Sequence, residues 1–199
     1  ERQFEVGIPP FVESISGSPY MYNGASYIYI PESCVSIGAS AFYYNGASEI
    51  EIEEKGETLT IGANAFGYTA SKENYNRLDV LRLPARAVQE KGYSILEECY
   101  IRAVIYGRGR TEIPSQLCYR AENGGYLSEI EDKPYFIFIP STVTSIGDFL
   151  LYPYGNPKRQ VYIICEGSWS SITKSSNWDG ASGGRENVKI YSESCLYKS

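Results

Sequence analysis

Residues 35–42 have the sequence VSIGASAF, and residues 59–66 restate it as LTIGANAF. The two copies lie 24 positions apart, and recurrence at an interval of about 20 to 29 residues is typical of chains built from stacked supersecondary units. One such unit cannot bury its apolar side chains alone, so each unit must pack on its neighbours. The repeat therefore predicts a solenoid rather than a conventional two-layer domain.

The repeated element is an aliphatic residue, four mostly small or turn-forming residues, and a large apolar residue. Copies occur at 15–20, 37–42, 61–66, 113–118 and 146–151, with a degenerate copy at 88–93. The first residues of successive copies are 22 to 33 positions apart. We expect one solenoid domain over residues 1–199, with about six irregular repeats in 1–164 and a C-terminal cap in 165–199.

Short alternating runs precede several copies: YIYI at 27–30, EIEI at 49–52 and FIFI at 136–139. A period of two indicates strands with isoleucine facing the core. Further strands are expected at 81–83, 103–106, 161–164 and 188–191. One strand per unit makes consecutive strands parallel neighbours, and each short connection has room for one helical or 3-10 turn in an otherwise irregular back. The predicted fold class is an α/β-type repeat solenoid of short parallel strands.

The outward side of these strands is the candidate binding surface, because solenoids use their sheet as an extended contact area and aromatic side chains lose little entropy on binding. Its alternative role is a ladder that stabilises adjacent strands. The candidate ligand-binding residues are Tyr27, Tyr29, Phe136, Phe138 and Tyr162. The glutamates between them are expected to keep an edge of the sheet soluble rather than to bind a cation: Glu49, Glu51, Glu53, Glu54 and Glu57.

The five cysteines show no C-x-x-C pattern and no metal-ligand spacing. Cys34 stands where other copies carry valine, which indicates a small core residue. Whether Cys165 pairs with Cys195 depends on a distance that the sequence does not fix. Trp169 and Trp178 fall in the expected cap, where they are predicted to close the end of the core.

Composition excludes several classes of function. The chain has no histidine, which removes histidine triads and histidine-ligated zinc, and we predict no metal site and no cofactor. A net charge of −6 disfavours nucleic acid, and Arg108 with Arg110 is interpreted as solvated surface. No apolar run of about 18 residues exists to span a membrane. The first residue is Glu1 rather than methionine, so the chain looks like a mature or trimmed product from which a targeting segment is missing.

One catalytic pattern needs weighing. Ser171 and Lys174 satisfy the Ser-x-x-Lys spacing of acyl-transfer enzymes. No Lys-Thr-Gly-like strand accompanies the pair, and the expected cap is not a cleft between helical and sheet layers. We therefore assign no catalytic residue and expect a non-enzymatic protein.

The phrases IPESCVSIGASAF at 30–42 and IPSTVTSIG at 139–147 resemble BspA-like leucine-rich repeats of bacterial surface proteins. The resemblance implies a leucine-rich-repeat solenoid that is secreted or anchored at the cell surface of a bacterium. It also implies adhesion, toward host matrix proteins or other bacteria. Three functions stay open at this point: a module that binds a protein partner, a module that binds a glycan, and a spacer that holds another domain away from the cell.

Overall fold

The computed structural model describes residues 5–67, 77–90, 94–97, 100–115, 118–119, 134–148, 160–179 and 188–192. The sequence also predicts surface loops at 69–77, 120–133 and 152–160, which fall almost wholly outside these residues. Cys195, whose pairing with Cys165 the sequence leaves open, lies outside them as well.

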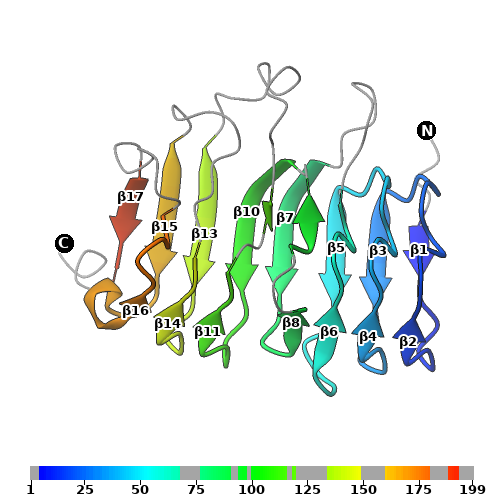
Figure 1. Cartoon of the computed structure of the whole chain (residues 1–199), viewed down its shortest axis with the longest axis horizontal. Helices are drawn as coiled ribbons and strands as arrows, with labels where there is room; N and C mark the ends of the chain where they lie inside the picture. The colour runs from blue at the N-terminus through cyan, green and yellow to red at the C-terminus, as the bar shows by residue number, and fades with distance from the viewer. Residues whose placement is uncertain are drawn as a thin grey trace.

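The main sheet is one row of eight strands, all parallel, in the order of the chain. They are β1 (Glu5–Gly7), β3 (Tyr27–Ile30), β5 (Glu49–Ile52), β7 (Arg77–Leu83), β10 (Tyr100–Tyr106), β13 (Tyr135–Ile139), β15 (Val161–Cys165) and β17 (Val188–Tyr191). Figure 1 shows the row from β1 at one end to β17 at the other. The predicted solenoid of consecutive parallel strands is confirmed.

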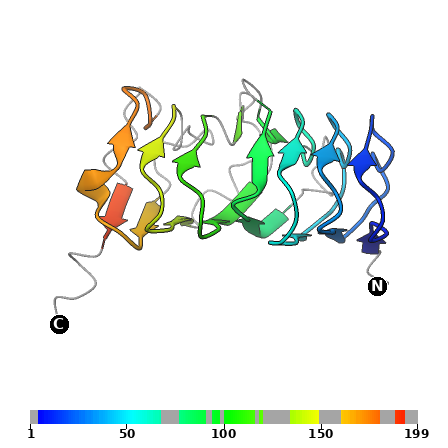
Figure 2. The same cartoon turned by 90° about the horizontal axis from the view of Figure 1, so that it is seen from below.

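A second wall of short strands follows the main sheet along the row (Figures 1 and 2). It has two parallel groups. The first is β2 (Ser14–Ile15), β4 (Ser36–Ile37), β6 (Leu59–Ile61) and β8 (Ala87–Gln89), and the second is β11 (Glu112–Ile113), β14 (Ser145–Ile146) and β16 (Thr173–Lys174). A separate pair joins β9 (Leu96–Glu97) to β12 (Cys118–Tyr119).

The second wall of strands corrects the expected irregular back with its short helical turns, and with it the α/β-type class, because the fold is a parallel β-solenoid with almost no helix. Within the described ranges, the 3-10 turn η1 (Trp169–Ser171) is the one helical segment. In the turn after β4, the amide of Ser40 donates to Ala63 O at 2.9 Å and that of Phe42 to Ala65 O at 2.8 Å. Ser40 has a left-handed φ of 56°. These amides bond to the next unit instead of to their own turn, so a helical turn does not form.

The core lies between the main sheet and the second wall, and it confirms the predicted strand parity. Inward residues of the main sheet are buried: Ile28, Ile30, Ile50, Ile52, Ile137, Ile139 and Ile163. The repeat's aromatic position forms a stacked ladder, with ring centroids 5.2 Å apart for Tyr20 and Phe42 and 5.6 Å for Phe42 and Phe66. Cys34 is fully buried, as its position in the repeat predicts.

The glycine of the repeat is required by the spacing between units. A Cβ on Gly62 would lie 2.8 Å from the amide nitrogen of Ala39 in the preceding unit. That contact is with backbone, which cannot move aside as a flexible side chain can. The I-G step of the sequence therefore marks where two turns of the solenoid touch.

The register of the degenerate copy differs from the predicted one. Val88 was expected to take the position of Ile61, but Ile61 pairs with Gln89 and Val88 pairs with Thr60. The apolar pattern of the sequence favours valine over glutamine at the inward position of the repeat. The observed register is shifted by one residue, and such a shift exchanges the two faces of a strand. In the observed register, Gln89 takes the position that Ile37 and Ile61 hold in their repeats. Arg86, three residues before Gln89, therefore takes the position that Cys34 holds before Ile37.

Candidate functional site

The five candidate residues all lie half-buried on the outward side of the main sheet. Tyr27 and Tyr29 are on β3, whereas Phe136 and Phe138 are on β13 and Tyr162 is on β15. The strands β5, β7 and β10 separate the two groups. The structure therefore divides the predicted surface into two parts with different surroundings.

The C-terminal part is a continuous aromatic strip made of Phe136, Phe138, Tyr162 and Tyr191. The ring of Phe136 stacks on Tyr162 at 5.1 Å with 14° between the planes, and Tyr162 stacks on Tyr191 at 6.2 Å and 21°. Phe138 lies 6.5 Å from Phe136, and the ammonium of Lys189 lies 5.7 Å from the Tyr162 centroid. Tyr191 was not among the predicted site residues. Its strand was predicted, and the alternation over residues 188–191 would have placed Tyr191 on the outward side.

The stacking fixes what this strip presents to solvent. Phe136 and Tyr162 are paired residues on neighbouring strands, and their nearly parallel rings cover one another's faces. Tyr162 is stacked on Phe136 and on Tyr191, so the strip offers apolar contact area but little open face at Tyr162 on which a flat ligand could stack.

The N-terminal tyrosines have their hydroxyl groups engaged within the sheet. Tyr27 donates a hydrogen bond to Glu51, and Tyr29 donates one to Glu53 at 2.7 Å, in each case across to the segment of β5. The hydrogen bond to the carboxylate raises the pKa of Tyr27 and of Tyr29 above the usual tyrosine range. The bond from Tyr29, with the Glu32 amide at 3.0 Å, lowers the pKa of Glu53. Both tyrosines thus hold carboxylates in place.

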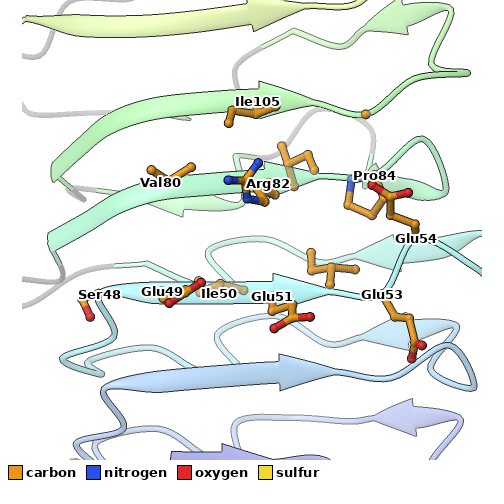
Figure 3. Close-up of a pocket in the computed structure, with 13 residues that line it drawn as sticks. Ser48, Glu49, Ile50, Glu51, Glu53, Glu54, Val80, Arg82, Pro84 and Ile105 are labelled. Carbon is orange, nitrogen blue, oxygen red and sulfur yellow. The ribbon is translucent and has the colours of Figure 1, made fainter.

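Beside them the sheet surface is hollowed by a groove of about 600 Å³ between β5 and β7, reaching β10 (Figure 3). The residues along it include Glu49, Glu51, Glu53 and Glu54 on the β5 side and Arg82, Val80 and Ile105 on the other. The carboxylates of Glu51 and Glu53 lean toward β3, where they accept from Tyr27 and Tyr29 (Figure 3). The acidic run was expected to protect an edge, but β5 is an interior strand between β3 and β7. The glutamates therefore line a hollow within the sheet.

The groove opens because β5 and β7 pair over a short distance. Their register holds two residue pairs, ending at Ile50 with Leu81, whereas β3 and β5 share four pairs. Beyond this point the chain after β5 is bonded elsewhere: Glu53 N donates to Ile30 O at 3.0 Å, and Glu53 O accepts the Arg86 Nε–H at 2.6 Å. The two strands separate where this bonding takes over.

The arginines of the central repeats have structural roles that sequence reasoning missed. Arg110 was interpreted as solvated, yet it is 6 % exposed and donates to Pro84 O at 2.9 Å. Its neighbour Arg108 is solvated as expected, with an ion pair to Glu166 at 3.0 Å. Arg86 is also buried and donates to four backbone carbonyls. The repeat register could have revealed these roles, because Arg86 and Arg110 each lie three residues before the first residue of a repeat copy, Gln89 and Ile113.

The Ser-x-x-Lys pair is bonded to backbone. Ser171 Oγ donates to Ser168 O at 2.8 Å, and Lys174 Nζ donates to Trp169 O at 2.8 Å and to Ile172 O at 2.5 Å. Lys174 also lies 4.6 Å from the Trp169 ring centroid. Burial lowers the pKa of Lys174. Both side chains thus direct these hydrogen bonds to main-chain carbonyls rather than to one another.

The cap tryptophans meet edge to face, with Trp169 and Trp178 centroids 5.2 Å apart, and both pack on the core. Cys34 and Cys165 are buried free thiols. Across the described residues, no three histidine, cysteine or acidic side chains are grouped as metal ligands. In the same ranges, no helix has the length and apolarity needed to cross a bilayer.

The fold and this surface define a parallel β-solenoid whose main sheet carries an aromatic strip and an acidic groove on one side. No protein-family model matches the chain, and neither a curated protein nor a solved structure shows significant similarity to it. The resemblance to BspA-like repeats therefore stays a prediction.

Proposed function

We propose that this chain is a non-enzymatic binding module that holds a protein partner on the outward side of its main sheet. The observation that carries the proposal is the aromatic strip: four aromatic side chains in contact with one another on β13, β15 and β17, all on the outward side of the sheet. Aromatic side chains are enriched at protein interfaces because they bury large areas at a small entropic cost. The strip is also part of a long regular sheet, the surface that solenoids use for binding.

A protein partner fits this surface better than a glycan does. Sugar rings bind aromatic platforms through the ring face. Tyr162 is stacked between Phe136 at 5.1 Å and Tyr191 at 6.2 Å, and Phe136 has one face against Tyr162. The apolar strip and the neighbouring Lys189 suit the mixed apolar and polar contacts of a protein interface. The glycan-binding module is therefore the second candidate, favoured only at Tyr191, which is 41 % exposed at the end of the strip.

The non-enzymatic part of the proposal is supported by the bonding of Ser171 and Lys174. A serine nucleophile needs a base within hydrogen-bond reach, and Lys174 here directs its hydrogen bonds to Trp169 O and Ile172 O. Location at a bacterial surface and adhesion to host matrix or bacterial proteins rest on the resemblance of the repeats alone. A spacer role predicts no specific binding at all.

The test is a matrix-protein binding panel run beside a glycan array, with a strip variant and a matched control. The strip variant is Phe136→Ser with Tyr162→Ser. The control is Phe11→Ser with Tyr22→Ser, which removes two rings that are 80 % and 64 % exposed elsewhere on the molecule. We expect a panel protein to bind the wild type and the control but not the strip variant, with circular dichroism unchanged in all three.

Three other results would count against the proposal. Binding on the glycan array alone would transfer the site to the second candidate. Silence in both assays would favour the spacer. Equal protein binding by the strip variant and the wild type would remove the aromatic strip from the interface.

A further inference from the structure

The groove between β5 and β7 is not explained by the aromatic strip, although it reaches Ile105 of β10, the residue paired with Phe138 of the strip. Four glutamates and one arginine lie along it, so these residues together carry a net charge of −3. The carboxylates of Glu51 and Glu53 lie at its β3 side, against Tyr27 and Tyr29. The side chains of Glu49, Glu51, Glu54 and Arg82 are exposed. The groove is therefore open to a charged ligand from solvent.

The carboxylates are held in position rather than left mobile. Glu51 accepts from Tyr27 and Glu53 from Tyr29, and Glu53 also accepts the Glu32 amide at 3.0 Å. A phenol or amide donor leaves the carboxylate charge in place, so the groove keeps its negative potential near neutral pH. Preorganised charges lose less conformational entropy when a ligand binds than mobile ones do.

The spacing of these charges selects the form of the ligand. Glu49, Glu51 and Glu53 are alternate residues of one extended segment, and alternate residues of a strand lie roughly 6.6 Å apart on one face. The facing wall supplies apolar contact from Val80 and Ile105, and the groove follows the strands from Ser48 to Glu54 on the β5 side. An extended peptide with a cation at every second residue presents positive charges at the same interval.

We infer that the groove between β5 and β7 binds an extended protein segment in which lysine or arginine alternates with uncharged residues. This inference rests on the proposed function, because it names the chemistry of the partner that the same sheet surface would hold. The lysine side chains of the segment extend over β5, so that their ammonium groups reach the outward carboxylates of Glu49, Glu51 and Glu53. The residues between them turn toward solvent or toward Val80 and Ile105.

The test uses three labelled hexapeptides and the full chain at low ionic strength, with affinity measured by fluorescence anisotropy. The first peptide alternates lysine and threonine, the second carries the same residues as a block of lysines followed by threonines, and the third alternates glutamate and threonine. The alternating lysine peptide is expected to bind most tightly and the glutamate peptide not to bind. Binding should weaken as salt rises, because surface charges are screened.

Variants with equal net charge separate the groove from the general field of the protein. Glu49→Lys with Glu54→Lys reverses two groove charges, and Glu13→Lys with Glu112→Lys makes the same change at exposed positions on or next to the second wall. We expect the groove variant to lose about tenfold in affinity, since each exposed charge contact contributes a fraction of a kcal/mol, and the control to lose far less. Arg82→Gln removes the one cation in the lining and should tighten binding.

Several results would overturn the inference. These are equal binding of the alternating and block peptides, equal losses in the groove and control variants, and weaker binding by Arg82→Gln. Self-association of the chain that the groove variant abolishes, without peptide binding, would make a second copy the occupant and would also overturn it. The strip variant Phe136→Ser with Tyr162→Ser should bind the peptide normally.

The outcomes for the two sites are distinguishable. Panel binding through the strip with no peptide binding overturns only the groove assignment. Peptide binding in the groove with a silent panel overturns only the proposed function.

Discussion

Replacement of Arg86 is the most direct test of the hydrogen bonds that join successive units of the solenoid. It is 8 % exposed, and its guanidinium reaches back to two preceding units. Nε donates to Glu53 O at 2.6 Å, Nη2 to Pro31 O at 2.8 Å, and Nη1 to Cys34 O at 2.9 Å and Glu57 O at 3.1 Å. One side chain thus donates to main-chain carbonyls at the corners of two units.

The replacement Arg86→Met keeps a long apolar side chain and removes every donor. The bonds to Pro31 O and Cys34 O are buried. Pro31 O keeps the Cys34 amide at 3.1 Å, whereas Cys34 O loses the guanidinium donor, and an unsatisfied buried acceptor costs about 1 to 3 kcal/mol. The carbonyls of Glu53 and Glu57 are part-buried and recover some bonding from water. Relief of the buried charge offsets part of the loss, so we expect unfolding free energy to fall by about 1 to 3 kcal/mol.

The assay is urea unfolding followed by circular dichroism, with the m-value checked for each protein. Arg108→Met is the matched control, because that guanidinium is 84 % exposed and its loss should leave the unfolding midpoint unchanged. A midpoint for Arg86→Met as close to wild type as that of the control would refute the role assigned to Arg86 and the register that places it.

Three further predictions concern other parts of the fold. Gly62→Ala should lower the unfolding free energy by about 1 to 3 kcal/mol in urea, because its Cβ would meet backbone of the preceding unit at 2.8 Å; Gly46→Ala, with nothing within 4 Å, should be tolerated, and equal losses would contradict the close approach. The hydrogen bond to Glu53 raises the pKa of Tyr29, so the stability that this bond contributes is present below the ordinary tyrosine pKa of about 10 and is lost as the pH rises further. Urea unfolding midpoints above pH 10 should therefore fall more steeply for the wild type than for Tyr29→Phe. Parallel slopes would show that the bond is unimportant for stability. Burial raises the pKa of the Cys34 thiol, so a maleimide followed by mass spectrometry should label this residue in urea but not in the native protein; rapid native labelling would mean that the core opens readily.

The parts of the fold that depend on local pattern could be predicted from the sequence. Alternation in YIYI, EIEI and FIFI placed isoleucine inward and aromatic or acidic residues outward, because the period of a strand is two. The 24-residue restatement of VSIGASAF made successive strands parallel neighbours. Cys34 was placed in the core by its phase in the repeat alone, and the structure buries it completely.

The candidate surface was predicted only as a set of residues. Outward parity identified Tyr27, Tyr29, Phe136, Phe138 and Tyr162, but it carried no information about the strands between them or the partners of their side chains. The two tyrosines bond to Glu51 and Glu53, and the other three join Tyr191 in the strip. These groupings depend on cross-strand register, which the irregular central repeats obscured.

The sequence by itself determined a stack of repeating units, their strand directions and the inward faces, because each of these follows from the spacing of apolar residues along the chain. The tertiary structure decided the second wall, the register at Gln89, the buried arginines and the groove. Each of these depends on hydrogen bonds between units: Ser40 and Phe42 donate to the next turn, and Glu53 O accepts Arg86. Such bonds join residues 23 to 33 positions apart, and the identity of either partner alone does not reveal them.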